Sequence, residues 1–491
     1  WEKVAEDRES HLTVPEIRNS IQQYREQTGD SKLTMIGFDA CLMGMFEIAY
    51  ELKDQTEMVH GSEAYEPLEG WTYNHLLYKL KKNLTNSELA NHIVNDYVES
   101  YRNGSVYTSY SVTAAVIDTS KLPTLWNDLD NFSKTLNTLK DFKFDLKTLD
   151  KFKKFKTIVL IGMGGSILGS EAIHGLMENK INKRVYFLND LNSKKILNLK
   201  KSEDLNKALF IVISKSGNTI ETLTNFFSFN IIKKDSKNII IISERANNLL
   251  YNLAKKFNLK YVEHKSHIGG RYSVLSETGM IPAYLMGLNT FSLRKNIQKF
   301  LNGSNKTFLK NSTVQLANLL SSKKKNNLIF LNYSPRIEKF LFWCQQLIAE
   351  SLGKNKNGFL PVVSNVPKDH HSLLQLYLDG PKDKIFDILS FEKKFKVKIN
   401  INKRLGVSFF LNKKKLSSVK EAQKRALIKI FMKKNIPFRE FKIKKINEEI
   451  LGELFSFFII ETIIVGKLLN IDPFNQPAVE QVKVYTKKLL T

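Results

Sequence analysis

The chain has 491 residues, of which 42% are hydrophobic, and because single cores rarely exceed about 250 to 300 residues we expect two or three globular domains. Its two cysteines, Cys41 and Cys344, lie far apart in sequence, which excludes a disulfide framework and a cysteine-based metal site and favours a cytoplasmic protein. The net charge of +26 is uneven, since residues 1–135 hold 12 Lys and Arg against 21 Asp and Glu, whereas residues 136–491 hold 63 against 28.

The basic part of the chain raises the question of a nucleic-acid partner. Its excess charge is scattered lysine, without the clusters of arginine and aromatic residues typical of nucleic-acid binding, so we expect no such partner. A lysine-rich surface is solvated and can also attract a small anion. The longest apolar run, 454–465, is interrupted by Glu461, and the chain starts at Trp1 without a basic and apolar leader, so we also expect no membrane segment.

The N-terminal part mixes helical and strand patterns. An apolar strand at Leu33–Phe38 runs into a helical period at Leu42–Leu52. The pattern predicts a segment of α/β character over residues 1–135.

From Thr157 onward one design repeats along the chain. A β-branched strand at Thr157–Ile161 is followed by a glycine-rich turn at Gly162–Gly169 and a helix at Glu171–Met177. Further strands of this set are predicted at Val185–Leu188, Leu209–Ile213, Ile239–Ile242 and Lys260–Val262. Strands that alternate with helices predict a doubly wound parallel sheet covered on both faces.

A second set of strands predicts a second α/β domain. These strands are expected at Asn327–Leu331, Phe359–Val363 and Lys396–Ile401. We therefore expect an N-terminal segment at 1–135, two α/β domains with parallel sheets at 136–310 and 311–470, and a C-terminal helix at 471–491.

The first glycine-rich turn is a candidate anion site. Residues 162–166 leave a buried strand and open a helix, so their backbone amides and the helix dipole favour an anion there. The dinucleotide fingerprint requires glycine at the sixth position, where Ile167 stands, although Asp190 ends the next strand and keeps a nicotinamide enzyme as an alternative.

A second polar turn follows the strand at Leu209–Ile213. Its hydroxyls and ammonium can donate to a phosphate group, and they belong to Ser214, Lys215, Ser216 and Thr219. The alternative is a helix capping box that includes Glu221. Two such turns at the carboxyl ends of strands in one sheet favour a phosphate site, because ligands of open α/β sheets bind there.

Six motifs in this order resemble those of phosphoglucose isomerases. After the two turns come Gly269–Ser273, Gln346–Lys354, His370–Leu376 and Gln476–Lys483. The resemblance runs from about residue 137 to the end and implies two sugar isomerase domains. It also implies interconversion of glucose 6-phosphate and fructose 6-phosphate in glycolysis and gluconeogenesis, through ring opening and a cis-enediol intermediate, without metal or cofactor.

The resemblance assigns roles to particular residues. Glu350 would be the base that moves a proton between C2 and C1, and Arg271 would stabilise the enediolate. His371 would act in ring opening together with Lys483. The phosphate group would be bound by Gly165, Ser166, Ser214, Lys215, Ser216, Thr219 and Gln476.

The resemblance also implies a homodimer in which His371 enters the site of the neighbouring subunit. His370 stands where glutamine is common in the family. The two adjacent histidines suggest a metal site, but no carboxylate or cysteine spacing supports it, so we expect none. A noncatalytic module that only binds sugar phosphates would lack the residues that fill the catalytic positions of the family here.

Residues 1–135 resemble a second family, the clostripain-like cysteine peptidases, through Ile36–Met43, Gly61–Glu63 and Gly70–Trp71. The resemblance implies a partial caspase-like segment in which Cys41 is the nucleophile and Asp39 recognises a basic side chain before the cleaved bond. It offers, as an alternative function, an endopeptidase that cleaves after Arg or Lys.

A cysteine nucleophile needs a histidine base, and the sequence argues against one. His11 lacks the glycine that follows the catalytic histidine of the family, so we expect an inactive peptidase remnant. Both families are missing their N-terminal parts, and the composition changes abruptly near residue 136. These features suggest a reading frame that joins pieces of two genes, with a genuine fusion as the alternative.

Overall fold

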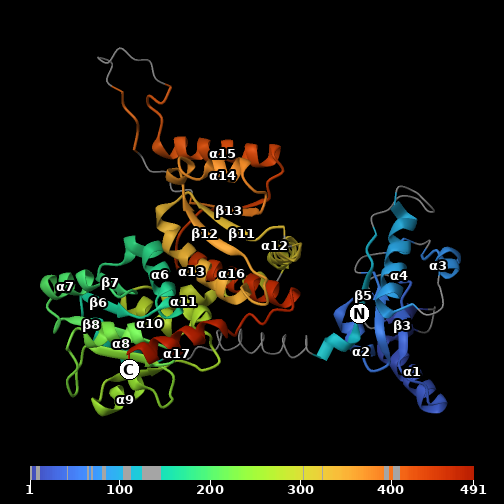
Figure 1. Cartoon of the computed structure of the whole chain (residues 1–491), viewed down its shortest axis with the longest axis horizontal. Helices are drawn as coiled ribbons and strands as arrows, with labels where there is room; N and C mark the ends of the chain where they lie inside the picture. Colours follow the sequence, from blue (N-terminus) through green and yellow to red (C-terminus); the bar gives the residue numbers. More distant parts are fainter. Residues whose placement is uncertain are drawn as a thin grey trace. The chain divides into compact units, whose positions relative to one another are not determined.

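The computed structural model describes residues 3–6, 11–40, 43–62, 66–67, 70–79, 84–102, 112–123, 145–301, 303–322, 324–391, 397–401 and 410–490. The chain divides into two compact units, Trp1–Leu136 and Asn137–Thr491 (Figure 1). The division coincides with the change of charge in the sequence. Within the described ranges, none of the helices combines the length and the apolar character needed to cross a bilayer.

The first unit is built on a three-stranded sheet in the order β3 (Leu33–Gly37), β4 (Thr56–Gly61), β5 (Ala115–Asp118). Strand β3 is parallel to β4, and β5 is antiparallel to it. A separate hairpin pairs β1 (Lys3–Glu6) with β2 (His11–Thr13). Helices whose full extent is described in this unit are α1 (Val14–Thr28), α2 (Phe46–Leu52), α3 (Tyr73–Lys79) and α4 (Asn86–Tyr101).

Local sequence explains where the longer helices of this unit begin. The Thr13 side chain accepts from the backbone N–H of Glu16, whose carboxylate accepts in return, so α1 starts with a capping box. Thr85 and Glu88 repeat the arrangement at the start of α4. The core between the sheet and helices α1 and α2 is built from apolar side chains that include Val14, Phe38, Ala49, Leu52 and Val59.

The second unit begins with a five-stranded parallel sheet in the order β10-β9-β8-β6-β7. Its strands are β6 (Thr157–Ile161), β7 (Arg184–Leu188), β8 (Ala208–Ile213), β9 (Ile239–Ser243) and β10 (Lys260–Glu263). Every residue of β6, β8 and β9 is buried, as expected of central strands covered on both faces.

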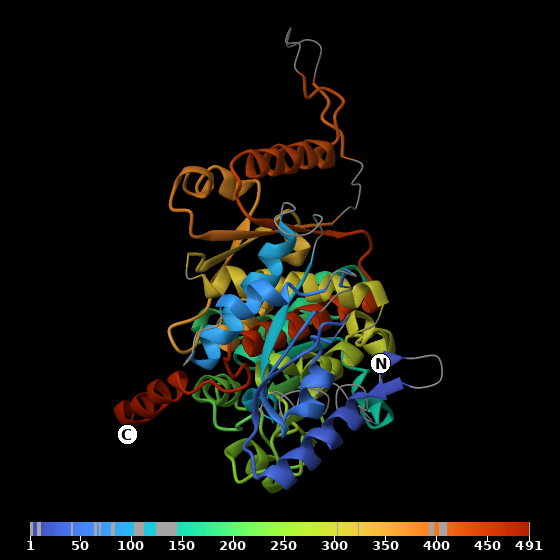
Figure 2. The ribbon, with the colours of Figure 1, turned by 90° about the vertical axis from the view of Figure 1, so that its right-hand side faces the viewer.

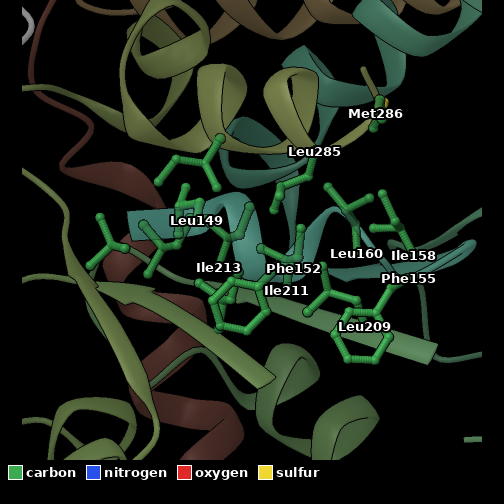
Figure 3. Close-up of a cluster of buried hydrophobic side chains, with 14 of the residues drawn as sticks. Leu149, Phe152, Phe155, Ile158, Leu160, Leu209, Ile211, Ile213, Leu285 and Met286 are labelled. Carbon is green, nitrogen blue, oxygen red and sulfur yellow. The ribbon is translucent and has the colours of Figure 1, made fainter. Parts of the chain in front are cut away.

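Alternate residues of these strands point to two different cores. Leu160 and Ile211 face the core beneath the 3-10 helix η3 (Leu146–Phe152) and helix α10 (Glu277–Leu285), which Figure 3 shows. Val159 and Phe210 face the opposite core. The helices that contribute to this opposite core are α7 (Ser193–Ser202), α8 (Ile220–Phe227) and α9 (Leu249–Lys256).

A second parallel sheet has the order β12-β11-β13-β14. Its strands are β11 (Asn327–Asn332), β12 (Leu360–Asn365), β13 (Lys384–Phe391) and β14 (Phe438–Ile443). Helices α14 (Leu374–Asp379) and α15 (Leu416–Lys433) cover one face. The α/β fold class with two parallel sheets in this part of the chain is thereby confirmed.

The other helices join and complete these two layers. Helix α13 (Glu338–Leu352) packs against α6 (Leu168–Met177) and thus connects the second sheet to the first. Helix α13 also packs against α16 (Glu448–Leu468), in part through Trp343 and Phe455. The remaining helices are α11 (Thr290–Lys295), α12 (Gly303–Ser321) and α17 (Ala478–Leu490).

One predicted strand is wrong. Residues 397–401 lie outside the sheet and carry only an isolated bridge between Lys398 and Lys415. The third and fourth positions of the sheet belong to β13 and β14 instead. The buried run from Ile385 to Leu389 fills the place beside β11, whereas Val397 and Lys398 are exposed.

Candidate active site

The first glycine-rich turn forms a short 3-10 helix, η4 (Gly164–Ser166), between β6 and α6. Gly164 has a positive φ of 51°. A Cβ atom on Gly165 would lie 2.3 Å from the carbonyl carbon of Gly270 and 2.5 Å from the backbone nitrogen of Arg271. The bare glycine therefore allows the glycine-rich turn to pack directly on η6 (Gly270–Leu275), the helix that carries Arg271.

The second polar turn follows β8, which lies beside β6 in the sheet. The Ser214 and Thr219 hydroxyls are 2.9 Å apart. Thr219 precedes α8 without capping it through its side chain, so the capping-box alternative is wrong. The predicted phosphate-binding hydroxyls thus hold each other at the carboxyl end of the strand.

The charged group of this turn already has protein partners. The Lys215 ammonium donates to the Ser266 carbonyl at 2.8 Å and lies 3.6 Å from the Glu244 carboxylate. The Ser216 hydroxyl accepts from the backbone N–H of Asn218 at 3.4 Å. These contacts fix the turn, while Lys215 keeps about a third of its side chain exposed.

Glu350 lies on the last turn of α13, beside the glycine-rich turn. Its carboxylate lies 3.6 Å from the Arg271 guanidinium and accepts a hydrogen bond of 3.0 Å from the Gln346 side chain. The same Gln346 amide borders Gly164, where a Cβ atom would lie 2.8 Å from Nε2. Three motifs that are far apart in sequence therefore meet at one place.

The Arg271 side chain is almost completely buried and is held by several hydrogen bonds to the protein. Its Nε donates to the Ser351 hydroxyl at 2.8 Å, and Nη1 donates to the Gln476 side chain at 3.0 Å. Its Nη2 donates to the carbonyls of Pro473, at 2.5 Å, and Asn475, at 3.0 Å. The guanidinium thus holds the C-terminal segment, including Gln476, against the helix that carries Glu350.

Lys354, which was not predicted to be a site residue, reinforces this contact. Its ammonium donates to the Asp472 carbonyl at 2.6 Å and to the Ser351 carbonyl at 2.8 Å. Burial and the nearby Arg271 charge lower the pKa of Lys354 to about 8. Its place at the end of the Gln346–Lys354 motif was the signal that could have identified it.

The other two predicted catalytic residues lie at exposed positions. His371 follows the 3-10 helix η9 (Lys368–His370), beyond the carboxyl end of β12. Its neighbour His370 is half-buried and lies 3.2 Å from the Tyr333 hydroxyl, and burial lowers the pKa of its imidazole. Lys483 lies on α17, which Figure 2 shows extending outward from the body of its unit.

The first unit holds Asp39 in the loop just after β3. Its carboxylate accepts from the Trp71 backbone at 3.2 Å and from the Tyr73 hydroxyl at 2.9 Å. Cys41 lies outside the described residues. His11 belongs to the β2 strand of the separate hairpin.

Two further titratable residues near Asp39 were not predicted from the sequence. His60 is fully buried, with its ring edge-on to Trp71 at 4.6 Å, and burial lowers its pKa to about 4. Burial and the Asp39 charge raise the pKa of Glu66 to about 7. Throughout the described ranges of the chain, no three His, Cys, Asp or Glu residues are grouped to hold a metal ion.

Both resemblances are confirmed by comparison with known proteins. The clostripain family matches residues 3–312, a range that extends beyond the first unit into the second. The glucose-6-phosphate isomerase of Methanocaldococcus jannaschii is 32% identical over 364 residues, which cover 70% of this chain and 87% of that protein.

Solved structures agree on the fold. A hypothetical protein from Thermus thermophilus superposes with a TM-score of 0.66 at 25% identity, covering 76% of this chain and 96% of that one. A glucose-6-phosphate isomerase from Chlamydia trachomatis gives a TM-score of 0.60 at 15% identity, covering 100% of this chain and 87% of that one. The chain therefore belongs to the glucose-6-phosphate isomerase family and, through the clostripain match over more than half of its length, to the clostripain family as well.

Proposed function

We propose that the second unit interconverts glucose 6-phosphate and fructose 6-phosphate. The observation that carries this proposal is the position of Glu350, 3.6 Å from Arg271 and adjoining the glycine-rich turn through Gln346. A proton-transferring carboxylate, a fixed cation and a phosphate-binding turn are the groups that an aldose-ketose isomerase requires. The activity of the M. jannaschii relative supports the same assignment.

The phosphate group of the substrate would bind between the two turns. The backbone of Gly165 and Ser166 lies at the start of α6, and Ser214, Lys215, Ser216 and Thr219 supply hydroxyls and an ammonium. The parallel arrangement of β6 and β8 brings both turns to the same edge of the sheet.

Glu350 would then transfer the proton. Its carboxylate takes the proton from C2 of the open-chain aldose, the electron pair of that bond forms the C1–C2 double bond, and the C1 carbonyl oxygen takes up the negative charge. The proton of the C2 hydroxyl then passes to the C1 oxygen. As the C2 oxygen forms the ketone, the electron pair of the double bond takes the proton back from Glu350 at C1. Arg271 favours the negative charge that develops on these oxygens, since its position is fixed before the reaction.

Ring opening would be the task of His371 and Lys483. An imidazole can pass a proton to the ring oxygen as the bond between that oxygen and C1 breaks, and the proton of the C1 hydroxyl, released as the C1 carbonyl forms, restores it. We propose that His371 serves the site of a neighbouring subunit in a homodimer, which is consistent with its exposed position after η9.

The test is the conversion of fructose 6-phosphate to glucose 6-phosphate by the purified chain and by Glu350→Gln. The variant keeps the shape of the side chain but removes the base, so kcat is expected to fall by about 10²- to 10⁴-fold. The exposed Glu178→Gln is the matched control and should leave the rate unchanged. A Glu350→Gln enzyme with the wild-type rate would refute the assignment of the base.

We further infer that the first unit has no peptidase activity, although it belongs to the clostripain family. The His60 imidazole is fully buried against Trp71, and His11 lies on a hairpin outside the main sheet, so neither is placed as a mobile general base. An arginyl peptide substrate should remain uncleaved, with or without a thiol-directed inhibitor. Cleavage that the inhibitor abolishes would contradict this inference and identify Cys41 as a working nucleophile.

A further inference from the structure

A cavity of about 330 Å³ lies in the second unit, at the edge of its second sheet where the parallel strands begin. The loops before β11, β13 and β14 surround it, and they contribute Lys325, Lys382 and Pro437 respectively. The candidate catalytic residue His371 follows β12 at the opposite, carboxyl edge of this sheet. The cavity is therefore separate from the proposed isomerase site.

Positive charge dominates the rim of the cavity. Its lining includes four lysines, Lys325, Lys382, Lys384 and Lys434, and one acidic residue, Asp379. Lys384 is buried and its charge is neutralised, because its ammonium lies 2.6 Å from the Asp383 carboxylate. The other three ammonium groups outnumber the single carboxylate of the lining, so the cavity favours an anion.

The lysine side chains differ in how firmly the protein holds them. Lys325 is half-buried and its ammonium donates to the Lys382 carbonyl, which places one positive charge at a fixed point. Lys382 and Lys434 are exposed and can turn toward a ligand. Asp379, at the end of α14, accepts from the Gln375 side chain at 3.3 Å.

The wall of the cavity is apolar. It is lined by Leu378, Pro381, Ile436 and Pro437 and by the edge-to-face pair of Tyr377 and Phe386. A sugar phosphate would place hydroxyl groups against this wall, whereas a flat ring would make favourable apolar contact with it. The volume is within the lower part of the range usual for sites of small organic ligands.

We propose that this cavity binds a nucleotide, with the base against the apolar wall and the phosphates among Lys325, Lys382 and Lys434. The charge selects the phosphates, and the wall distinguishes a nucleotide from inorganic phosphate. This proposal does not depend on the isomerase activity of the unit.

The test is calorimetric titration of the full chain with ATP, with adenosine and with inorganic tripolyphosphate. ATP should bind more tightly than either compound, since adenosine lacks the phosphates and tripolyphosphate lacks the base. Tripolyphosphate that binds as tightly as ATP would overturn the proposal, because the apolar wall would then contribute nothing.

Three variants locate the binding. Lys325→Gln combined with Lys434→Gln removes two charges and should weaken ATP binding by about tenfold or more. The matched control, Lys194→Gln with Lys201→Gln, removes two exposed charges from α7 and should change the affinity by less than about twofold. Unaltered thermal unfolding of the first variant shows that it is folded.

The third variant distinguishes the cavity from the phosphate-binding turns. Ser214→Ala with Ser216→Ala should bind ATP as the wild type does. If this variant loses ATP binding while the lysine variant retains it, the nucleotide occupies the isomerase site and the proposal is wrong.

Discussion

The ammonium of Lys354 donates to the backbone carbonyl of Asp472 at 2.6 Å and so joins the end of the Glu350 helix to the C-terminal segment. The same segment is held by Arg271 through the carbonyls of Pro473 and Asn475. The hydrogen bonds from Lys354 and Arg271 to the backbone carbonyls of this segment thus hold Gln476 close to Glu350. This contact connects the proposed base to the part of the chain that carries Lys483.

The pKa of Lys354 gives this contact a pH dependence. Because the pKa is lowered to about 8, the side chain is an ammonium at neutral pH and loses its charge as the pH rises through 8. A neutral amine donates more weakly to Asp472 and no longer balances the Glu350 charge. We therefore expect kcat/KM of the isomerisation to fall above pH 8.

Lys354→Arg tests the origin of this fall, since a guanidinium stays charged over the whole range. The variant should retain its kcat/KM to higher pH, even if the rate at neutral pH is lower. Complete pH–rate profiles of the two proteins provide the measurement. An unchanged fall near pH 8 in the variant would assign the titration to another group.

The contact between the glycine-rich turn and the Arg271 helix leads to a prediction about stability. In Gly165→Ala the added methyl group would meet the backbone of Gly270 and Arg271, and backbone atoms cannot rotate away. We expect the free energy of unfolding to fall by about 2 kcal/mol or more, together with a loss of isomerase activity.

Gly270→Ala is the matched control, because a Cβ atom there meets nothing within 4 Å and the φ angle of Gly270 is not in the left-handed region. Its unfolding free energy should remain within about 0.5 kcal/mol of wild type in denaturant titrations. Equal destabilisation of the two variants would show that the close packing of η4 on η6 is not the cause.

The parts of the fold that were predictable are those encoded locally. The strand, turn and helix from Thr157 to Met177 follow one another in sequence, so apolar runs and glycine positions suffice to place them. The same holds for the turn at Ser214–Thr219. The packing of these turns on η6 and α13 was not predictable from periodicity, since it depends on bare glycines that face distant backbone.

What the sequence left open depends on contacts between distant residues. The sequence of residues 396–401 is as typical of a strand as the sequence of β13. The two segments differ in that only β13 pairs with β11. The partners of Arg271 in the C-terminal segment lie 202 to 205 positions away, so these bonds could not be inferred from any local pattern.

A buried ion cluster in the second sheet illustrates the same point. Arg439 on β14 donates to both oxygens of Asp387 on β13, at 2.8 and 2.5 Å, and to the Glu461 carboxylate on α16 at 2.6 Å. The two carboxylates are almost completely buried, and the Ser312 hydroxyl also donates to Glu461. One guanidinium therefore balances two acids that have little access to water.

Removal of this cation should destabilise the second unit strongly. Arg439→Met leaves Asp387 and Glu461 without their charge partner, and the unfolding free energy at pH 8 is expected to fall by about 3 to 5 kcal/mol. Burial already raises the pKa of Glu461 against the pull of Arg439. Without Arg439 the pKa of Glu461 rises further and this acid is protonated more readily, so the loss of stability should be smaller at pH 5 than at pH 8.

The matched control is Arg425→Met, which removes an exposed arginine paired with Glu421 on the surface of α15. It should cost at most about 1 kcal/mol at either pH, because exposed ion pairs contribute little. A triple variant that combines Arg439→Met with Asp387→Leu and Glu461→Leu should recover most of the stability, since it leaves no unpaired charge in the core. If Arg439→Met unfolds at the same denaturant concentration as Arg425→Met, the cluster does not stabilise this sheet. The favourable pairing of Arg439 with the two acids would then be cancelled by the free-energy cost of burying the three charges.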